Sequence, residues 1–401
     1  MPQLTEASNL PPAPFNAQTV VFKDSTIRQT LKLTLGTSRL RIRISNAFGT
    51  TPLSITAASI ALPVNNSAGV NAIQPNTAKT ITFSGQPSFT LPNAALAISD
   101  PIDFPGANAG AIVAVTLYLA QGQQGQDVTS HPGSRTTSWF TFGNQVTAAT
   151  LTGSALASAA HWYFLSAVEA WTDTDTSSLV LIGDSITDGR GSTTDQNDRW
   201  SDALFKRLQT LQSPLNKIAV SNQAAGGNRI LLDGLGPSTL ARIERDVLSH
   251  PNVGYAVIFS GVNDIGVAAA STAAQTQIFN DLIAAYSQII SRIHASGIPV
   301  IGATITPFSA PNSTIQPYSD AGGIREATRQ KVNNWIKNTG GFDAVADFDA
   351  AVKDPASPTR LSPLYNSGDF LHLNPAGYAK LADAFPVNSL VSLQGGVSGF
   401  K

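Results

Sequence analysis

The sequence predicts a chain of two domains, in which an antiparallel β-sandwich of the jelly-roll kind precedes an α/β domain built on a parallel sheet. Two patterns predict this fold class. Short runs of alternating apolar and polar residues fill the chain from about residue 16 to residue 171, and strands alternate with helical stretches beyond it. The polar stretch "WTDTDTSS" at 171–178 separates the two patterns. We therefore expect domains at residues 1–175 and 176–401, which agrees with a length of 401 residues.

The N-terminal half repeats with a period of two residues. In "LRIRIS", at 40–45, Leu40, Ile42 and Ile44 fall on one face of a strand. Arg41 and Arg43 fall on the opposite face, and we expect both to be exposed. The same alternation recurs at 27–36, 111–120 and 137–144, and Gly, Pro and Asn separate these runs. This pattern is typical of antiparallel sheets that bury one face.

The C-terminal half alternates between two kinds of segment. Strands are predicted at 178–183, 217–222, 255–262 and 298–307, and helices at 199–211, 238–250, 278–297, 324–338 and 375–385. Such an order predicts βαβ units and a doubly wound parallel sheet. Because ligands of these folds bind beyond the carboxyl ends of the strands, we expect the functional residues directly after each strand.

Composition excludes several classes of protein. A formal net charge of −1 provides no field that would attract nucleic acid, and the absence of cysteine excludes disulfides and thiolate metal sites. No apolar run reaches the roughly 20 residues that a membrane span needs. Charged residues make up only 13% of the chain, and Asn65 and Asn312 lie in glycosylation sequons. We expect a secreted protein whose signal peptide is replaced by Met1, with a cytoplasmic location as the alternative; the sequence indicates no oligomeric state.

The first strand of the α/β half ends in Gly183-Asp184-Ser185. A phosphate loop is disfavoured because Arg190 follows Gly189 at the wrong spacing for a Walker motif and no G-x-G-x-x-G is present. A serine at a strand-to-helix turn exposes its hydroxyl and has its N–H near a helix N-terminus. A nucleophile that generates an oxyanion needs both features. The alternative is a Ser/Asp turn that only caps the helix.

Further polar residues follow the later strands. Gly226 and Gly227 let the backbone approach a ligand, and Asn263 offers a side-chain amide as a neutral donor. Asp369 and His372 are three residues apart, so the carboxylate can reach Nδ1 and leave Nε2 free to accept a proton. Each alone could be a turn, a cap or a surface loop. Together with the serine they describe acyl transfer.

Two other carboxylates, Asp184 and Asp264, flank the serine and the asparagine. We expect them to brace their loops by accepting backbone N–H bonds. Asn374 and Pro375 predict the start of the last long helix, as N-cap and first helical residue.

Four segments in this order resemble the sequence blocks of the SGNH (GDSL) hydrolase family: "GDSIT" with Ser185, "NQAAGGN" with Gly227, "GVND" with Asn263, and "DFLH" with Asp369 and His372. The resemblance covers roughly the last 225 residues. It implies a flavodoxin-like three-layer α/β/α domain and a metal-free serine esterase that needs no cofactor. It further implies catalytic roles for Ser185, His372 and Asp369, with an oxyanion hole formed by Ser185, Gly227 and Asn263. More loosely, "SNAFGT" and "HPGSRTTSWF" resemble the β-sandwich that precedes this domain in some secreted members.

The expected reaction is hydrolysis of carboxylic esters, with a preference for short acyl or acetyl groups and with carbohydrate as a candidate carrier of these groups. A lysophospholipase or lipase-type acylhydrolase and an acyltransferase are alternatives. A glycan-binding protein with an inactive hydrolase-like domain is the alternative of another class.

Two further groups of residues have weaker interpretations. Asp195, Asn197 and Asp198 could form a calcium loop, but the spacing lacks the glycine and the distal glutamate of an EF-hand. A solvated loop that caps the following helix is favoured. We expect four histidines to be structural or superficial: His131, His161, His250 and His294.

Overall fold

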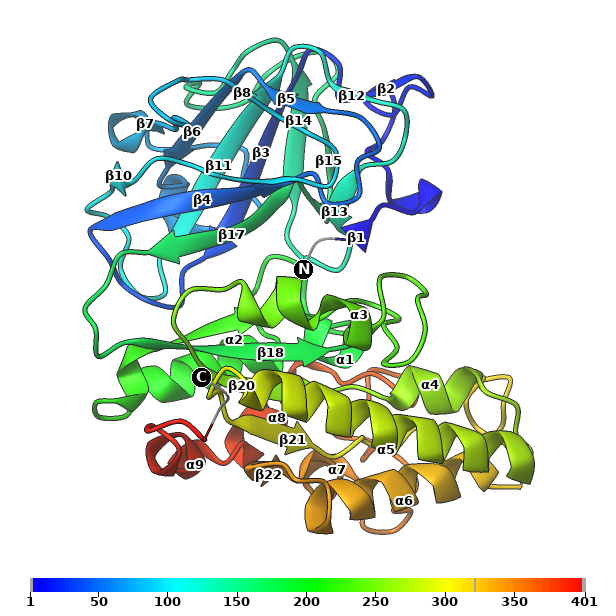
Figure 1. Ribbon diagram of the computed structural model, residues 1–401. Helices are drawn as coiled ribbons and strands as arrows, with labels where there is room; N and C mark the ends of the chain where they lie inside the picture. Colours follow the sequence, from blue (N-terminus) through cyan, green and yellow to red (C-terminus); the bar gives the residue numbers. More distant parts are fainter. Residues whose placement is uncertain (1–2, 321, 399–401) are drawn as a thin grey trace. The chain divides into compact units, whose positions relative to one another are not determined.

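The computed structural model describes residues 3–320 and 322–398, and it divides into two compact units (Figure 1). The first unit runs to Asp173 and includes the short segment Thr194–Asn197. The second unit contains Thr174–Thr193 and the chain from Asp198 onward.

The first unit is an antiparallel β-sandwich, as predicted. Its larger sheet has the order β15 (Ala157–Ala159), β14 (Ser138–Phe142), β3 (Ser25–Lys32), β11 (Ile112–Leu119), β6 (Ala57–Ala61) and β7 (Lys79–Thr80). A second sheet has the order β10 (Ile102–Asp103), β4 (Arg39–Ser45) and β17 (Leu165–Ala170), and β9 (Leu96–Ile98) also pairs with β4. Smaller groups join β1 (Gln3–Leu4), β13 (Thr129–His131) and β16 (Trp162–Tyr163); β2 (Val20–Val21) and β12 (Gln123–Gln124); and β5 (Leu53–Ile55) and β8 (Phe89–Leu91).

The strand predicted at 27–36 lies further toward the N-terminus. It starts at Ser25 and ends at Lys32, because β3 pairs residue for residue with β11 over exactly that range. The inward-facing alternation nevertheless holds. Ile27 on β3 and Phe140 on β14 are fully buried, and Phe140 contacts Phe22 with ring centroids 5.2 Å apart. An aromatic core of this kind accounts for much of the sandwich's stability.

The prediction that Arg41 and Arg43 are both exposed is wrong for Arg43. This residue is 4% exposed, and its Nε lies 3.4 Å from a carboxylate oxygen of Glu169 on β17. Arg41 contacts the other oxygen of the same carboxylate at 2.5 Å. Burial of Arg43 is tolerated because a carboxylate accompanies it, a partner 126 residues away that alternation cannot reveal.

The segment Thr194–Asn197 also differs from expectation. Both carboxylate oxygens of Asp195 accept hydrogen bonds from Thr137, one from its N–H and one from its hydroxyl, each at 2.7 Å. The carboxylate of Asp195 is therefore hydrogen-bonded to the sandwich unit and is not part of a solvated loop. The cap of the following helix comes instead from Asp202, which accepts the N–H of Arg199 at 3.2 Å.

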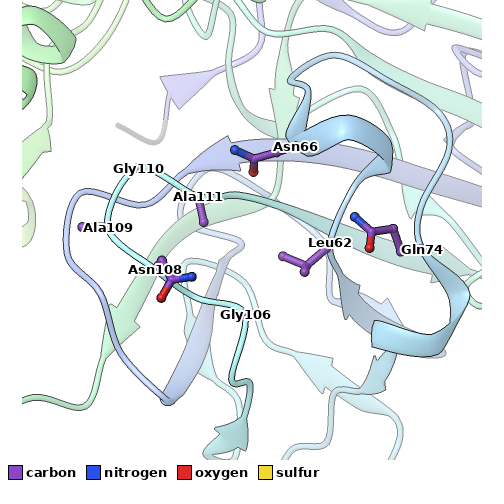
Figure 2. A pocket seen from close by; sticks show the side chains of 8 residues that line it. All are labelled: Leu62, Asn66, Gln74, Gly106, Asn108, Ala109, Gly110 and Ala111. Atoms are coloured by element: carbon purple, nitrogen blue, oxygen red, sulfur yellow. The ribbon is translucent and has the colours of Figure 1, made fainter.

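A cavity of about 360 Å³ lies in the first unit (Figure 2). Its lining is Leu62, Asn66, Gln74, Gly106, Asn108, Ala109, Gly110 and Ala111, without an aromatic or charged side chain. Two of its three amides serve the fold. Asn66 accepts the N–H of Ile112 at 2.7 Å, and Gln74 donates to the carbonyl of Pro63 at 3.0 Å.

The second unit contains a parallel sheet, as predicted. The strand at Ala344–Ala346 was not predicted and adds a fifth to the four expected strands of this sheet. The order of the sheet is β19 (Ile218–Asn222), β18 (Ser177–Gly183), β20 (Val253–Phe259), β21 (Val300–Ala303) and β22 (Ala344–Ala346). The strands therefore run in the order 2-1-3-4-5, which is the flavodoxin-like arrangement. The first strand has the second on one side and the third on the other, so the topological switch point lies at the end of β18.

Helices cover both faces of this sheet (Figure 1). They are α1 (Ser185–Asp188), α2 (Trp200–Gln209), α3 (Thr239–Ile243), α4 (Val262–Val267), α5 (Thr272–His294), α6 (Ile324–Asn338), α7 (Phe348–Val352), α8 (Pro375–Ala384) and α9 (Val387–Ser392), with a π-helical turn at Glu244–Leu248 after α3. The helices α2, α7 and α8 pack together, and α3, α4, α5 and α6 form a second group. Asn374 caps α8 by accepting the N–H of Gly377 at 2.9 Å, which confirms the predicted start of that helix.

The strand that leads to the serine is buried on both faces. Leu179, Val180, Leu181 and Ile182 are all fully buried, as expected for the central strand of a parallel sheet. The strand ends at Gly183, where a Cβ atom would lie 2.5 Å from the Thr187 hydroxyl and 2.8 Å from the Phe259 carbonyl oxygen. Only glycine fits there, because the chain turns sharply against its own helix and the neighbouring strand.

Candidate active site

Ser185 begins α1 directly after the end of β18. The N-cap of this helix is Asp184, whose carboxylate accepts the N–H of Ile186 at 3.0 Å. The single turn ends at Gly189, which has a left-handed backbone with φ of 97°. The serine is thus held on a short, capped turn at the switch point of the sheet.

The structure brings together the three residues predicted for acid–base and nucleophilic chemistry. The Oγ of Ser185 lies 2.7 Å from Nε2 of His372, and Nδ1 of His372 lies 2.6 Å from Oδ2 of Asp369. Ser185 and His372 are buried, whereas the Asp369 side chain is 37% exposed. An imidazole held in this way can accept the hydroxyl proton at Nε2 while its Nδ1–H remains bonded to the carboxylate.

The Asp369 carboxylate is itself held in place by the backbone. Its Oδ1 accepts the N–H groups of His372 at 2.8 Å and Leu371 at 3.0 Å. Partial burial acts to raise the pKa of Asp369, but the imidazole and backbone N–H of His372 outweigh it and hold this pKa well below its usual value. The carboxylate is therefore ionised over the neutral pH range and faces the imidazole as an anion.

The glycine loop after β19 is tied to the strand that carries the serine. The N–H of Ala225 donates to the carbonyl of Gly183 at 3.1 Å. Gly227 follows with a φ of 67°, in the region that favours glycine. In the part of the chain that the structure describes, the N–H of Gly227 has no acceptor. It is therefore available to a ligand.

Asn263 lies in the first turn of α4, after the neighbouring strand β20. Its Nδ2 donates to the carbonyl of Asn228 at 2.8 Å, which joins it to the residue after Gly227. Its Oδ1 accepts the hydroxyl of Tyr318 at 2.8 Å. Ser185, Gly227 and Asn263 thus follow three adjacent strands at the same edge of the sheet.

A buried arginine links the loops that carry these groups. Arg242 on α3 is 1% exposed and donates to the carbonyls of Gly183 at 3.2 Å and Gln223 at 2.6 Å. Its Nη2 also donates to Oδ1 of Asn228 at 2.8 Å. Its charge is balanced by Asp246, with 3.0 Å between Nη1 and Oδ2. In the sequence, Arg242 and Asp246 are only two residues four positions apart in a predicted helix. No pattern in the sequence indicates that Arg242 also contacts the loops of the candidate site.

Asp184 and Asp264 act on the loops as predicted. Asp264 accepts the N–H groups of Ile230 at 2.9 Å and Leu231 at 3.0 Å. Burial raises the pKa of Asp184 to about 7, and the nearby charges of Asp264 and Asp188 add to this rise. Burial likewise raises the pKa of Asp264 to about 6, against the two N–H donors that lower it.

Of the remaining predicted polar residues, none is bonded to the serine. His161 donates from Nδ1 to the carbonyl of Pro132 at 2.6 Å, and His294 pairs with Asp343 at 2.7 Å. Asp198 accepts the N–H of Thr193 at 2.8 Å. Within residues 3–320 and 322–398, no group of three or more His, Asp or Glu side chains is arranged to hold a metal ion. No helix in that part is long and apolar enough to span a bilayer.

Two residues near the site escaped prediction because they lie in an irregular segment. Tyr318 bonds to Asn263, and Gln316 donates from Nε2 to the backbone carbonyl of Asp369 at 3.0 Å. Both belong to the loop between β21 and α6, whose sequence has no periodicity. Only the three-dimensional contacts reveal them.

The fold and the site define a doubly wound α/β domain with a serine, a histidine and an aspartate joined at the switch point. Residues 181–380 match the model of the GDSL-like lipase/acylhydrolase family, and this domain belongs to that family of hydrolases. The predicted resemblance is thereby confirmed.

Solved structures show further similarity. A GDSL-like lipase from Bacteroides thetaiotaomicron is 16% identical, with a TM-score of 0.40, over 56% of this chain and 93% of that one. A catalytic mutant of an acetylxylan esterase from Geobacillus stearothermophilus is 20% identical, with a TM-score of 0.38, over 53% of this chain and 94% of that one. A comparison with curated protein sequences finds no match.

Proposed function

We propose that this protein is a serine esterase that hydrolyses carboxylic esters through an acyl-enzyme, with Ser185, His372 and Asp369 as its catalytic triad. The observation that carries the proposal is the continuous hydrogen-bonded chain from Oγ of Ser185 through His372 to Asp369. This order of groups is the one that activates a serine hydroxyl in acyl transfer.

In the proposed mechanism, Oγ of Ser185 attacks the ester carbonyl carbon while Nε2 of His372 takes the hydroxyl proton. The tetrahedral intermediate collapses, the bond to the alcohol breaks, and His372 returns the proton to the leaving oxygen. Water then attacks the acyl-enzyme, again losing a proton to His372, and the acid is released as Ser185 regains its hydrogen. Asp369 stabilises the imidazolium that forms in both steps.

The oxyanion of each intermediate is proposed to accept the N–H groups of Ser185 and Gly227 and the side-chain amide of Asn263. Support comes from the acceptor-free N–H of Gly227 and from the position of all three residues at one edge of the sheet. Neutral donors fixed before the reaction stabilise developing charge without reorganisation, which accounts for a large share of catalysis in such sites.

For the substrate, we favour esters of short acyl groups, acetyl above all, with carbohydrate as a candidate carrier of these groups. The lightly charged, polar composition and the accompanying β-sandwich favour this class. A second candidate, an acylhydrolase for longer chains, has one observation in its favour. Leu232 and Leu235 are 61% and 54% exposed in the glycine loop, and a Cβ atom on Gly227 would lie 2.7 Å from Cδ1 of Leu235. An apolar side chain therefore borders a proposed oxyanion donor.

A fluorophosphonate probe and a panel of esters test the proposal. The probe is expected to label wild-type protein at Ser185 and to leave Ser185→Ala unlabelled. Asn263→Ala should lower kcat on an aryl acetate by about 10²–10³-fold. Labelling at another residue, or wild-type turnover by both variants, would refute the assignment.

The panel extends from acetyl to long acyl esters and includes acetylated glycans. A preference for acetyl esters supports the first substrate class, and a rise of kcat/KM with chain length supports the second. Ester synthesis on addition of glycerol would indicate an acyltransferase. Tight glycan binding without any turnover would indicate a binding protein.

A further inference from the structure

The side chain of Tyr318 is bonded to one of the proposed oxyanion donors rather than to the triad. Its hydroxyl lies 2.8 Å from Oδ1 of Asn263. Asn263 is 4% exposed, so bulk water does not replace this contact readily. The tyrosine is therefore the protein's own partner for the oxygen end of that amide.

The surrounding acceptors decide which way the Asn263 amide points. Its other end contacts the backbone carbonyl of Asn228, 2.8 Å away, and a carbonyl oxygen only accepts hydrogen bonds. The atom that faces it must therefore be Nδ2, and the atom that faces Tyr318 must be Oδ1. It follows that the tyrosine hydroxyl donates. Nδ2 has two hydrogens and donates one of them to the carbonyl of Asn228, which leaves one N–H for a ligand.

The hydrogen bond from Tyr318 has two physical consequences for that remaining N–H. It holds the amide plane, because rotation or a flip of the side chain would break bonds at both ends and leave a buried oxygen without a donor. It also withdraws electron density through the conjugated amide, which strengthens the N–H as a donor. Burial raises the pKa of Tyr318, so its hydroxyl keeps its proton at neutral pH.

The ring of Tyr318 is itself fixed by its neighbours. A Cβ atom on Gly266, in the same helix as Asn263, would lie 2.3 Å from ring carbons of Tyr318. The ring also meets Phe308 edge-on, with centroids 6.2 Å apart. The N–H of Tyr318 donates to Oε1 of Gln316 at 3.1 Å, and the same Gln316 bonds to the backbone of Asp369. The tyrosine is thus seated in a defined position against α4.

We infer that Tyr318 is a positioning residue that orients and polarises the Asn263 amide toward the oxyanion, an inference that rests on the proposed function. The Tyr318 hydroxyl should stabilise the transition state, where the oxyanion carries charge, and should hardly change the free energy of the ground-state complex. Loss of the hydroxyl should therefore lower kcat and leave KM nearly unchanged.

Steady-state kinetics of Tyr318→Phe on an aryl acetate test this inference. The expected result is a fall in kcat of about tenfold, the size of one neutral hydrogen bond, with KM within about twofold of wild type. In an Asn263→Ala background the same substitution should change kcat by less than about twofold, because the amide it acts through is gone. Tyr286→Phe is the matched control: it removes another buried tyrosine hydroxyl, which donates to the carbonyl of Ser260 at 2.5 Å, and should leave kcat unchanged.

Gly266→Ala provides a second route if Tyr318→Phe folds poorly. The new methyl group would displace the ring, so kcat should fall in the wild type and change little in the Asn263→Ala background. Wild-type kcat for Tyr318→Phe, a fall of equal size in both backgrounds, or an effect confined to KM would overturn the inference while Asn263→Ala still loses activity. Full activity of Asn263→Ala would instead refute the proposed oxyanion hole.

Discussion

The guanidinium of Arg242 donates to the backbone carbonyl of Gly183, two residues before the serine, over 3.2 Å. The same side chain reaches the carbonyl of Gln223 and the side chain of Asn228 on the adjacent loop. A single buried cation therefore holds together the ends of the first two strands of the sheet. The guanidinium of Arg242 therefore stabilises both loops, the one that carries Ser185 and the one that carries Gly227, although it contacts neither of these two residues.

Replacement of Arg242 by methionine should destabilise the domain strongly. The substitution leaves Asp246 with a reduced set of partners and leaves the carbonyl oxygen of Gln223 without its donor, which is expected to cost about 3–5 kcal/mol of unfolding free energy. Urea unfolding monitored by tryptophan fluorescence measures this loss. Arg292→Met is the control, because its pair with Glu244 is largely at the surface and should contribute only about 0–1 kcal/mol. Equal losses for the two variants would contradict the role assigned to Arg242.

The sequence predicted those features that depend on repeated local patterns. Alternation such as that at 40–45 identified the sandwich, because one face of each strand packs on a core. The run Leu179–Ile182 identified a central parallel strand, because both of its faces are buried. The helix predicted at 324–338 has the bounds of α6, since an apolar period of 3.6 residues and clear ends coincide there.

The candidate site was predictable for a different reason. Ser185, Gly227, Asn263 and the Asp369–His372 pair each follow a strand or precede a helix within a short characteristic block. The parallel topology then implied that such blocks meet at one edge of the sheet. Their joint occurrence in order was informative, whereas each block alone resembled an ordinary turn.

Contacts between distant segments that carry no such characteristic block were beyond the reach of the sequence. Arg43 is buried because Glu169 comes beside it on another strand, and Tyr318 matters because a loop without periodicity returns to Asn263. Such pairings are set by the three-dimensional path of the chain. No local propensity or spacing encodes them in a single sequence.

Asp369→Asn should lower kcat by about 10³–10⁴-fold on an aryl acetate. The neutral amide cannot stabilise the imidazolium, and its NH₂ group would favour the wrong tautomer of His372. The second His–Asp pair of this domain supplies the control. His294 and Asp343 are 2.7 Å apart and have no bond to Ser185, so Asp343→Asn should retain kcat. A comparable fall in both variants would show that the loss arises from the fold rather than from the proposed triad.

Asp184→Asn should change how stability depends on pH. Burial raises the pKa of Asp184 to about 7 in the folded protein, from an ordinary value of 3.8. Between these values the folded state keeps a proton that the unfolded chain has lost, so the free energy of unfolding falls as pH rises from about 4 to about 7. Asparagine does not titrate, yet its side-chain oxygen can still accept the N–H of Ile186 as a helix cap. The variant should therefore gain stability relative to wild type across this window, by a few kcal/mol at about pH 8.

Urea unfolding of both proteins at intervals between about pH 2 and about pH 8 measures this difference. Asp369→Asn is a control of opposite sign, because the pKa of Asp369 is held low in the folded state. Its carboxylate contributes stability that is present above the unfolded pKa and is lost as pH falls below it. As pH falls below 4, the free energy of unfolding of Asp369→Asn should therefore approach that of wild type. The free energy of unfolding of Asp184→Asn should already match that of wild type at about pH 4. Parallel profiles of wild type and Asp184→Asn from pH 4 to pH 8 would mean that this buried carboxyl group does not titrate with a raised pKa.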